Sequence, residues 1–187
     1  MDKNFLNELK VDCRNRKIPI ISDNTETFLT QLLLTHKPQF CLEIGSASGY
    51  SSIMMASLLA NRGWKILTIE RAYPSYKECI ANITASKLRN IWSYHWDTLA
   101  LDIQRLSFGK FDFVFIDGRK SEYREYILKC KSLVARNFII ILDDAILYAN
   151  KLQSVYEFFS KKQIKYEIKQ LDADDGIIIT SDPALFS

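Results

Sequence analysis

Short apolar runs alternate along the chain with segments in which apolar residues recur every three or four positions. The apolar runs are typical of buried strands, and seven are predicted, at 40–44, 64–69, 91–95, 111–116, 138–142, 164–169 and 176–180. The periodic segments predict helices at 4–14, 25–35, 53–60, 74–87, 98–106, 122–133 and 151–161. Either Asp23 or Asn24 is expected to cap the second helix, and the last two strands are expected to form an antiparallel hairpin.

This alternation of strands and helices predicts an α/β fold with a doubly wound, mostly parallel sheet and right-handed crossovers. No internal repeat, low-complexity tract or linker divides the sequence, so one domain over residues 1–187 is expected. In sheets of this kind, ligands bind at the carboxyl ends of the strands. The residues that follow each predicted strand are therefore the candidates for chemistry.

Acidic residues follow almost every strand that is expected to end at that edge. They are Glu43 within the first strand, then Glu70, Asp97, Asp117, Asp143 and Asp144. Because parallel strands end on the same side of a sheet, these carboxylates are expected to gather around one site. Asp143 and Asp144 also have a simpler interpretation, as residues that cap the following helix.

The segment after the first strand indicates the kind of ligand. Gly45 and Gly49 lie four residues apart between a strand and a helix, so a ligand approaches the backbone closely there. The dinucleotide fingerprint G-x-G-x-x-G is missing, and its first position is taken by Glu43, which suits a cationic ammonium or sulfonium better than a phosphate. Glu70, about 20 residues further on, is placed to bind both hydroxyls of a ribose. Together these residues favour S-adenosylmethionine over NAD, and an NAD-dependent oxidoreductase stays a distant alternative.

The overall composition says more about the class and cellular location of the protein than about its activity. The 187 residues carry a net charge of +3, with 48% hydrophobic and 25% charged residues, as in ordinary soluble domains. No apolar run reaches the length of a membrane span, and the charged N-terminus lacks the core of a signal peptide. The four cysteines are scattered and form no CxxC pair, which argues against a zinc site or disulfide framework. A cytoplasmic protein without a membrane partner is expected.

Three motifs then carry a resemblance to a known family. They are Leu-Glu-Ile-Gly-Ser-Ala-Ser-Gly-Tyr-Ser at 42–51, Phe-Ile-Asp-Gly-Arg-Lys-Ser-Glu-Tyr at 115–123 and Ile-Leu-Asp-Asp at 141–144. In this order and spacing they resemble the cation-dependent class I O-methyltransferases, the catechol and caffeoyl-CoA methyltransferase-like family. The resemblance implies a Rossmann-like, seven-stranded sheet of order 3-2-1-4-5-7-6 with the last strand antiparallel. It also implies that the helices of residues 1–37 cover the site.

The resemblance further implies a methyl transfer from S-adenosylmethionine to a hydroxyl of a small, catechol-like acceptor. A divalent cation, Mg²⁺ or otherwise Mn²⁺ or Ca²⁺, would be bound by Asp117, Asp143 and Asp144. Lys120 would act as general base, with Asp117 beside it as a second catalytic residue. The expected cofactor-binding residues are Glu43, Gly45, Ser46, Gly49, Tyr50, Ser51, Glu70, Arg71, Trp96, Asp97 and Asp117.

Several positions depart from the family pattern. Asp144 stands where Asn is usual, Gly118 and Arg119 where Ala and Asp are usual, and the segment after Asp144 is short. Trp96 replaces a usual glycine, either to stack on the adenine or to fill space. Two alternatives remain open: a methyltransferase for hydroxylated uridine in tRNA, and a protein that binds S-adenosylmethionine without catalysis. A homodimer is compatible with the family, and Lys120 alone also fits a solvated lysine at a helix start.

Overall fold

The computed structural model describes residues 3–59, 63–96 and 109–186. Its helices are α1 (Lys3–Asn15), α2 (Asp23–His36), α3 (Tyr50–Leu59), α4 (Tyr73–Ser86), α5 (Tyr123–Cys130) and α6 (Gln153–Lys162). Its strands are β1 (Phe40–Ile44), β2 (Lys65–Glu70), β3 (Ile91–His95), β4 (Phe111–Ile116), β5 (Val134–Leu142), β6 (Glu167–Gln170) and β7 (Gly176–Thr180). The expected helix at 98–106 and the candidate residue Asp97 lie outside the described residues.

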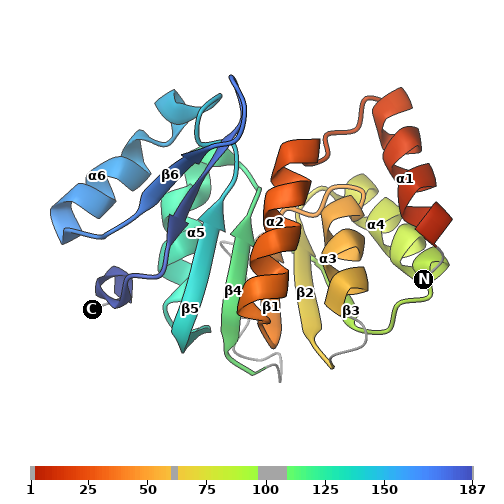
Figure 1. The fold of residues 1–187 in the computed structure, drawn as a ribbon, viewed down its shortest axis with the longest axis horizontal. Coiled ribbons are helices and arrows are strands. Elements are labelled where there is room, and N and C mark those ends of the chain that lie inside the picture. The colour runs from red at the N-terminus through yellow and green to blue at the C-terminus, as the bar shows by residue number, and fades with distance from the viewer. Residues whose placement is uncertain (1–2, 60–62, 97–108, 187) are drawn as a thin grey trace.

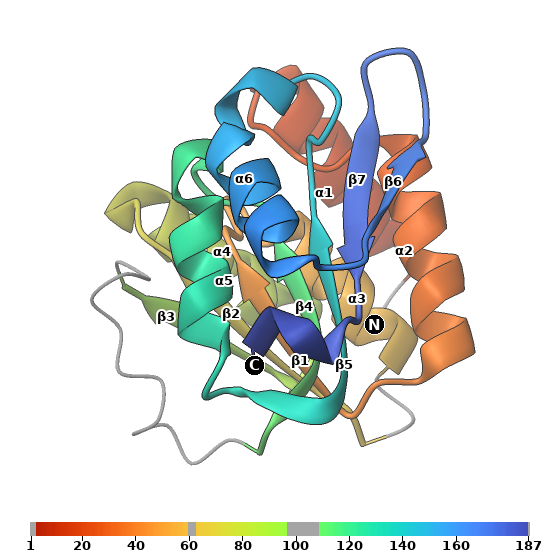
Figure 2. The same cartoon turned by 90° about the vertical axis from the view of Figure 1, so that its left-hand side faces the viewer.

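The strands form one seven-stranded sheet of order β3-β2-β1-β4-β5-β7-β6, with helices on both faces (Figure 1). Strands β1 to β5 are parallel, whereas β7 runs antiparallel to both β5 and β6. The predicted fold class, strand order and closing hairpin are therefore confirmed. Figure 2 shows β6 and β7 at one edge of the sheet, with α5 and α6 on one side and α2 on the other.

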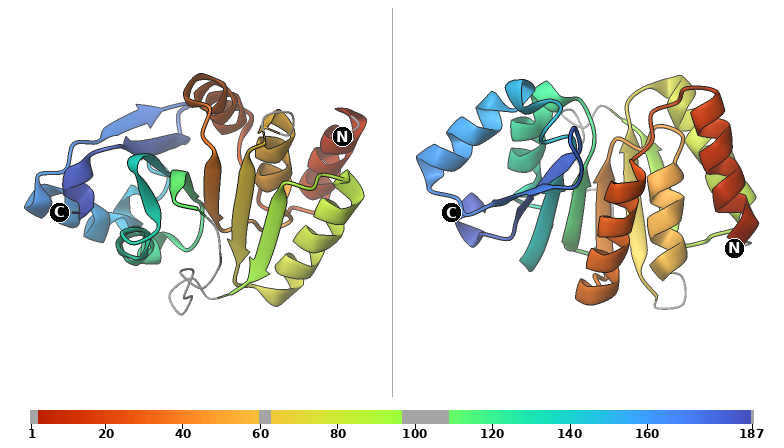
Figure 3. Two further views of the ribbon diagram at one scale, coloured as in Figure 1. Left: turned by 90° about the horizontal axis from the view of Figure 1, so that it is seen from below. Right: turned by 45° about the horizontal axis from the view of Figure 1, so that its top comes forward.

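Two apolar cores lie against the two faces of the sheet. Successive residues of β4 alternate between them, because side chains of a strand point in opposite directions: Phe113 packs with α1–α4, and Val114 packs with α5 and α6. Figure 3 shows the helices α1, α2 and α3 gathered over one face. Burial on both faces explains why the central strands are almost wholly apolar.

Several predicted boundaries were wrong, each for a local reason. Ser22, not Asp23 or Asn24, caps α2, since its hydroxyl accepts a hydrogen bond from the Thr25 N–H at 2.9 Å. Strand β5 starts at Val134 rather than 138, because Val134 pairs with Phe111 ahead of a register shift in β4. The helix expected at 122–133 is a 3₁₀ turn, Lys120–Glu122, followed by α5, which ends at Cys130. Helix α6 and strand β6 begin two and three residues later than expected.

The N-terminal helices α1 and α2 pack beside α3, and the connection between them runs toward the carboxyl edge of the sheet (Figure 1). Lys37 ends α2 in the left-handed conformation, at φ 50°, just before Pro38. Among the described residues, no helix has the length and apolar character needed to cross a membrane.

Candidate active site

A cleft of about 1080 Å³ opens at the carboxyl edge of the sheet. The ends of four neighbouring strands line it, through Ile44 to Ala47, Ile69 to Ala72, Asp117 to Ser121, and Asp143 with Asp144. The connection between α1 and α2 adds Pro19 to Ser22, and the β6–β7 turn adds Asp174 and Asp175. Of the acidic residues expected at this edge, Glu70, Asp117, Asp143 and Asp144 line this one cavity, whereas Glu43 does not.

The two glycines of the β1–α3 loop permit close packing of backbone segments. Gly45 has φ +93°, and a Cβ atom there would lie 2.4 Å from the carbonyl oxygen of Asp117. Gly49 has φ +85°, and a Cβ atom there would lie 2.8 Å from Sγ of Cys79. Both positions therefore exclude a side chain, by backbone angle and by space. Gly45 brings the loop against the end of β4, and Ser46, Tyr50 and Asp117 all line the cleft.

Glu43 lies beneath this loop, fully buried and outside the set of residues that line the cleft. Its two carboxylate oxygens accept hydrogen bonds from the hydroxyls of Ser51 and Ser52, in the first turn of α3. Burial raises the pKa of Glu43 to about 7, although these hydroxyls act in the opposite direction. Its predicted contact with the cofactor therefore stays a prediction, while its structural role is to join β1 to α3.

Glu70 ties the loop to the start of α4. One carboxylate oxygen accepts a hydrogen bond from the Ala47 N–H at 2.9 Å, and the other accepts one from the Ala72 N–H at 2.6 Å. Glu70 and Arg71 both line the cleft, and Arg71 forms an ion pair with Glu122. Trp96 follows β3 with 43% of its surface exposed and stacks on Tyr94, and it is not among the cleft-lining residues that the structure describes.

Asp117, Asp143 and Asp144 meet at the other end of the cleft. One carboxylate oxygen from each lies within 4.8 Å of the others. Asp143 is 5% exposed, and its Oδ1 atom has no hydrogen-bond partner among the described residues. Burial, followed by the charges of Asp117 and Asp144, raises the pKa of Asp143 well above its usual range. Burial likewise raises the pKa of Asp117 to about 6, against the opposing effect of Lys120.

Lys120 lies between two of these carboxylates. Its Nζ atom is 2.6 Å from Oδ1 of Asp117 and 2.6 Å from Oδ2 of Asp144. The ring centres of Tyr123 and Tyr148 lie 5.2 and 6.0 Å away. Burial lowers the pKa of Lys120, but the two carboxylates outweigh it, so the pKa is raised and the ammonium form is stabilised. The lysine predicted as a base is thus held in its protonated form by the predicted cation ligands.

The three carboxylates fit a hard divalent cation. They offer oxygen donors alone, which suit Mg²⁺, Mn²⁺ or Ca²⁺ and not a site built for zinc. The unpartnered, buried Oδ1 atom of Asp143 carries a desolvation cost that a bound cation would offset. Asp144 has φ +60°, a left-handed conformation that Asp and Asn tolerate better than most residues with a side chain.

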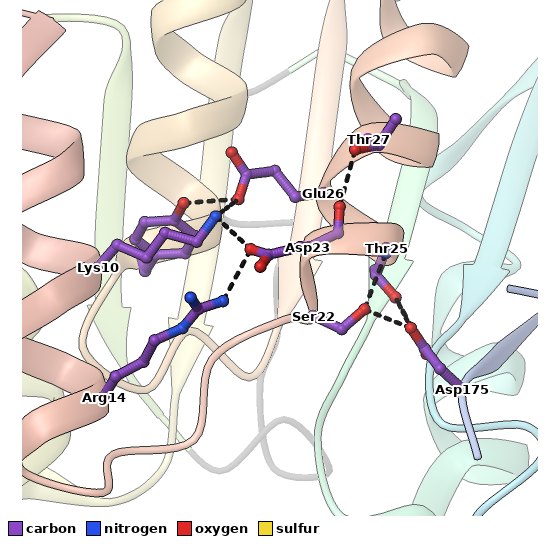
Figure 4. Close-up of polar contacts among 9 residues, drawn as sticks. Lys10, Arg14, Ser22, Asp23, Thr25, Glu26, Thr27 and Asp175 are labelled. Atoms are coloured by element: carbon purple, nitrogen blue, oxygen red, sulfur yellow. Dashed lines mark hydrogen bonds and ion pairs between the residues drawn. The ribbon is translucent and has the colours of Figure 1, made fainter. Parts of the chain in front are cut away.

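Two polar clusters hold the start of α2 in place (Figure 4). On one side Lys10 forms ion pairs with Asp23 and Glu26, and the Tyr50 hydroxyl donates to Glu26 at 2.7 Å. On the other side the hydroxyls of Ser22 and Thr25 donate to Asp175 in the β6–β7 turn. The start of α2 is therefore fastened both to α1 and α3 and to the β6–β7 turn.

A model of a family described as O-methyltransferase matches residues 2–181 of this sequence. The chain belongs to the O-methyltransferase family. The O-methyltransferase ankF from Aspergillus thermomutatus is 31% identical over 140 residues, which cover 70% of this chain and 56% of that protein. A Dictyostelium discoideum protein named Probable caffeoyl-CoA O-methyltransferase 3 is 24% identical over 81% of this chain and 62% of its own length. The chain thus spans only 56% and 62% of these curated relatives.

Solved structures of O-methyltransferases share the fold. The O-methyltransferase from Bacillus cereus, crystallised in complex with SAH, aligns with a TM-score of 0.82 and 21% identity, over 97% of this chain and 92% of that one. The family resemblance drawn from the three sequence motifs is therefore confirmed, as is the fold that it implied.

This member of the O-methyltransferase family also has cleft residues that the sequence did not single out. Leu147, 55% exposed, lines the cleft beyond the acidic cluster together with Tyr148 and Lys151. Pro19 and Ile20, in the α1–α2 connection, add apolar surface to the same cleft. In the sequence, Leu147 and Tyr148 follow the Asp143-Asp144 motif after two residues, and this closeness was the available signal for them.

Proposed function

We propose that this chain is an S-adenosylmethionine-dependent O-methyltransferase that acts, with a divalent cation, on a hydroxyl of a small, catechol-like acceptor. The observation that carries the proposal is one continuous cleft with the glycine loop at one end and three carboxylates and Lys120 at the other. Gly45 brings these ends together, because its backbone packs against Asp117. A methyl donor and its acceptor bound in such a cleft would meet at Asp117.

The cofactor end offers backbone and side-chain polar groups. Ser46, Tyr50 and Ser51 line the cleft along the glycine loop, and Glu70 and Arg71 line it at the end of β2. The carboxylate of Glu70 has remaining lone pairs for the two ribose hydroxyls, since it accepts one N–H bond at each oxygen. S-adenosylmethionine bound here would supply the methyl group.

The acceptor end offers charge next to apolar surface. Asp117, Asp143 and Asp144 would hold the divalent cation, which would lower the pKa of the acceptor hydroxyl and fix its orientation. Lys120 lies beside the same carboxylates and, once deprotonated, would take up the proton of that hydroxyl. Leu147, Tyr148, Pro19 and Ile20 give this end a surface that fits a small aromatic ring.

The direct test is methyl transfer to a panel of catechols and singly hydroxylated aromatics, assayed with Mg²⁺ and after chelation with EDTA. We expect transfer to adjacent dihydroxy compounds that is lost on chelation and restored by Mg²⁺. Transfer that is unchanged after exhaustive chelation would overturn the cation assignment. Calorimetric binding of S-adenosylmethionine without transfer to any acceptor would instead favour a binding protein that has no catalytic activity.

A further inference from the structure

Lys120 occupies the carboxylate oxygens that a divalent cation would need. Its ammonium makes 2.6 Å contacts with Asp117 and Asp144, the oxygens that a divalent cation would use. Its side chain is only 12% exposed, so little water screens it. A cation coordinated at about 2 to 2.6 Å by these oxygens would lie within about 5 Å of an unmoved ammonium.

Asp143 is the member of the cluster that Lys120 does not contact in an ion pair. No ion pair with Lys120 is present at Asp143, whose buried Oδ1 atom lacks a hydrogen-bond partner among the described residues. The cluster therefore combines three carboxylates with one ammonium, and it retains a buried oxygen that is directed at no protein donor. Such an oxygen favours the entry of a further cation.

Asp144 supplies the second contact that holds Lys120 in this place. An Asn at this position would accept the same left-handed backbone, with φ +60°, but would bring no charge. With Asp144, three carboxylates balance one divalent cation and one lysine. The additional charge of Asp144 thus explains how this chain both attracts a divalent cation and holds Lys120 in the cluster.

We propose that Lys120 competes with the divalent cation for Asp117 and Asp144, and that it gives up these contacts when the cation binds. Lys120 then occupies the carboxylates until the cation binds, and only afterwards serves the acceptor. Its amine becomes available to an acceptor hydroxyl only in the cation-bound protein. This inference rests on the cation dependence in the proposed function, and it adds the order in which the two positive groups use the carboxylates.

The experiment is calorimetric titration of the full chain with Mg²⁺ and with Ca²⁺, without cofactor or acceptor. Lys120→Met removes the charge and keeps a side chain of similar length. We expect it to tighten cation binding by about tenfold or more, because two positive charges no longer repel each other in a poorly screened site. Arg119→Met is the matched control: it removes the neighbouring positive charge, which pairs with Glu122 rather than with the cluster. We expect it to change the affinity by about twofold at most.

A second measurement uses the unaltered protein and does not depend on the folding of a variant. Trace acetylation followed by mass spectrometry reports how reactive the Lys120 amine is. We expect slow labelling without added cation and faster labelling with Mg²⁺, with Lys161 on the exposed end of α6 as an internal reference. If Lys120→Met unfolds, Lys120→Gln and this labelling experiment decide the question.

The outcomes separate this inference from the proposed function. Tighter binding by Lys120→Met together with faster labelling in Mg²⁺ supports the competition. Equal affinity of wild type and Lys120→Met, or labelling that does not respond to Mg²⁺, overturns the competition but leaves a cation site in place. If neither protein binds a divalent cation, both the competition and the cation dependence are wrong, and methyl transfer after chelation would then show whether the transferase assignment itself holds.

Discussion

Glu70 and Asp143 are both carboxylates at the same edge of the sheet, but their surroundings differ. Each oxygen of Glu70 accepts a backbone N–H bond, from Ala47 or from Ala72. Asp143 is buried, and its Oδ1 atom has no hydrogen-bond partner within the described part of the chain. The first carboxylate thus stabilises the loop around it, whereas the second costs free energy unless a charge joins it.

The same difference extends to both ends of the cleft. At the cofactor end, Glu43 is bonded by two serine hydroxyls, and both loop glycines are closely packed. At the acceptor end, one ammonium contacts two of three neighbouring carboxylates, and the third, Asp143, makes no ion pair with it. A preformed loop can bind its ligand without reorganising. The acidic cluster holds like charges close together, which strains it, so it is expected to lower the stability of the protein in exchange for activity. Four variants would test this difference.

The largest effect on methyl transfer is expected for Asp143→Asn. The change keeps the shape of the side chain and removes one charge from the proposed cation site, so methyl transfer should fall by at least about a hundredfold. Because an unpaired buried charge is also removed, the free energy of unfolding without added cation should rise by about 1 to 3 kcal/mol. Urea denaturation and the transfer assay measure the two effects, which have opposite signs for function and for stability.

Asp112→Asn is the matched control for that variant. Asp112 lies at the opposite end of the sheet, in β4, where it accepts N–H bonds from Gln39 and Phe40 at 2.8 and 2.9 Å. Its replacement should lower stability by about 1 kcal/mol and leave transfer unchanged. A stability loss at Asp143 as large as that at Asp112 would contradict the view that the acidic cluster is strained.

Gly45→Ala should disrupt the cofactor end. The new Cβ atom would meet the Asp117 carbonyl at 2.4 Å, in a residue with φ +93°, so a loss of about 4 kcal/mol in unfolding free energy is expected. Gly63→Ala is the comparison, because Gly63 also has positive φ, +73°, but nothing lies within 4 Å of its added Cβ. It should cost only about 1 kcal/mol. Equal losses would mean that backbone angle alone, and not packing against β4, requires Gly45.

The two ends of the cleft also differ in what the sequence could predict. The cofactor end follows from ten consecutive residues, 42–51, in which a strand, a glycine turn and a helix follow each other. The acidic cluster needed the strand order as well, because Asp117 and Asp143 are adjacent only where β4 pairs with β5. The contacts of Lys120 with both Asp117 and Asp144 could not be predicted from the sequence, because they depend on the conformation of one long side chain.

The element boundaries show the same limit. Local rules placed β1 at Phe40–Ile44 correctly, because its apolar run is bounded by Pro38 and Gly45. They missed the first four residues of β5, which are partly polar and become a strand by pairing with β4. They also missed Ser22 as the cap of α2, where two further candidates follow at once.

A pH series on Glu43→Gln would measure how much the buried Glu43 carboxyl contributes to the stability of the protein at each pH. Glu43 has a pKa of about 7 in the folded protein against 4.5 for an ordinary glutamate, so the unfolded chain loses this proton first. Stability due to Glu43 is therefore complete below pH 4.5, falls as the pH rises toward 7, and levels above it. Relative to wild type, Glu43→Gln should gain about 3 kcal/mol in unfolding free energy between pH 4 and pH 8. Parallel urea-denaturation curves across this range would show that Glu43 does not titrate in this way.

The smallest effect is expected for Glu70→Gln, which keeps the size of the side chain and replaces one of its acceptor oxygens by an NH₂ group. The amide keeps one oxygen acceptor for the Ala47 or Ala72 N–H, but its NH₂ group faces the other N–H and offers the ribose no second acceptor. Affinity for S-adenosylmethionine should fall by about tenfold, and divalent-cation affinity should stay unchanged because Glu70 is outside the acidic cluster. Calorimetry with each ligand measures both. If cation affinity fell together with cofactor affinity, the two ends of the cleft would be coupled through Gly45 and Asp117, and the contrast between a preformed end and a strained end would fail.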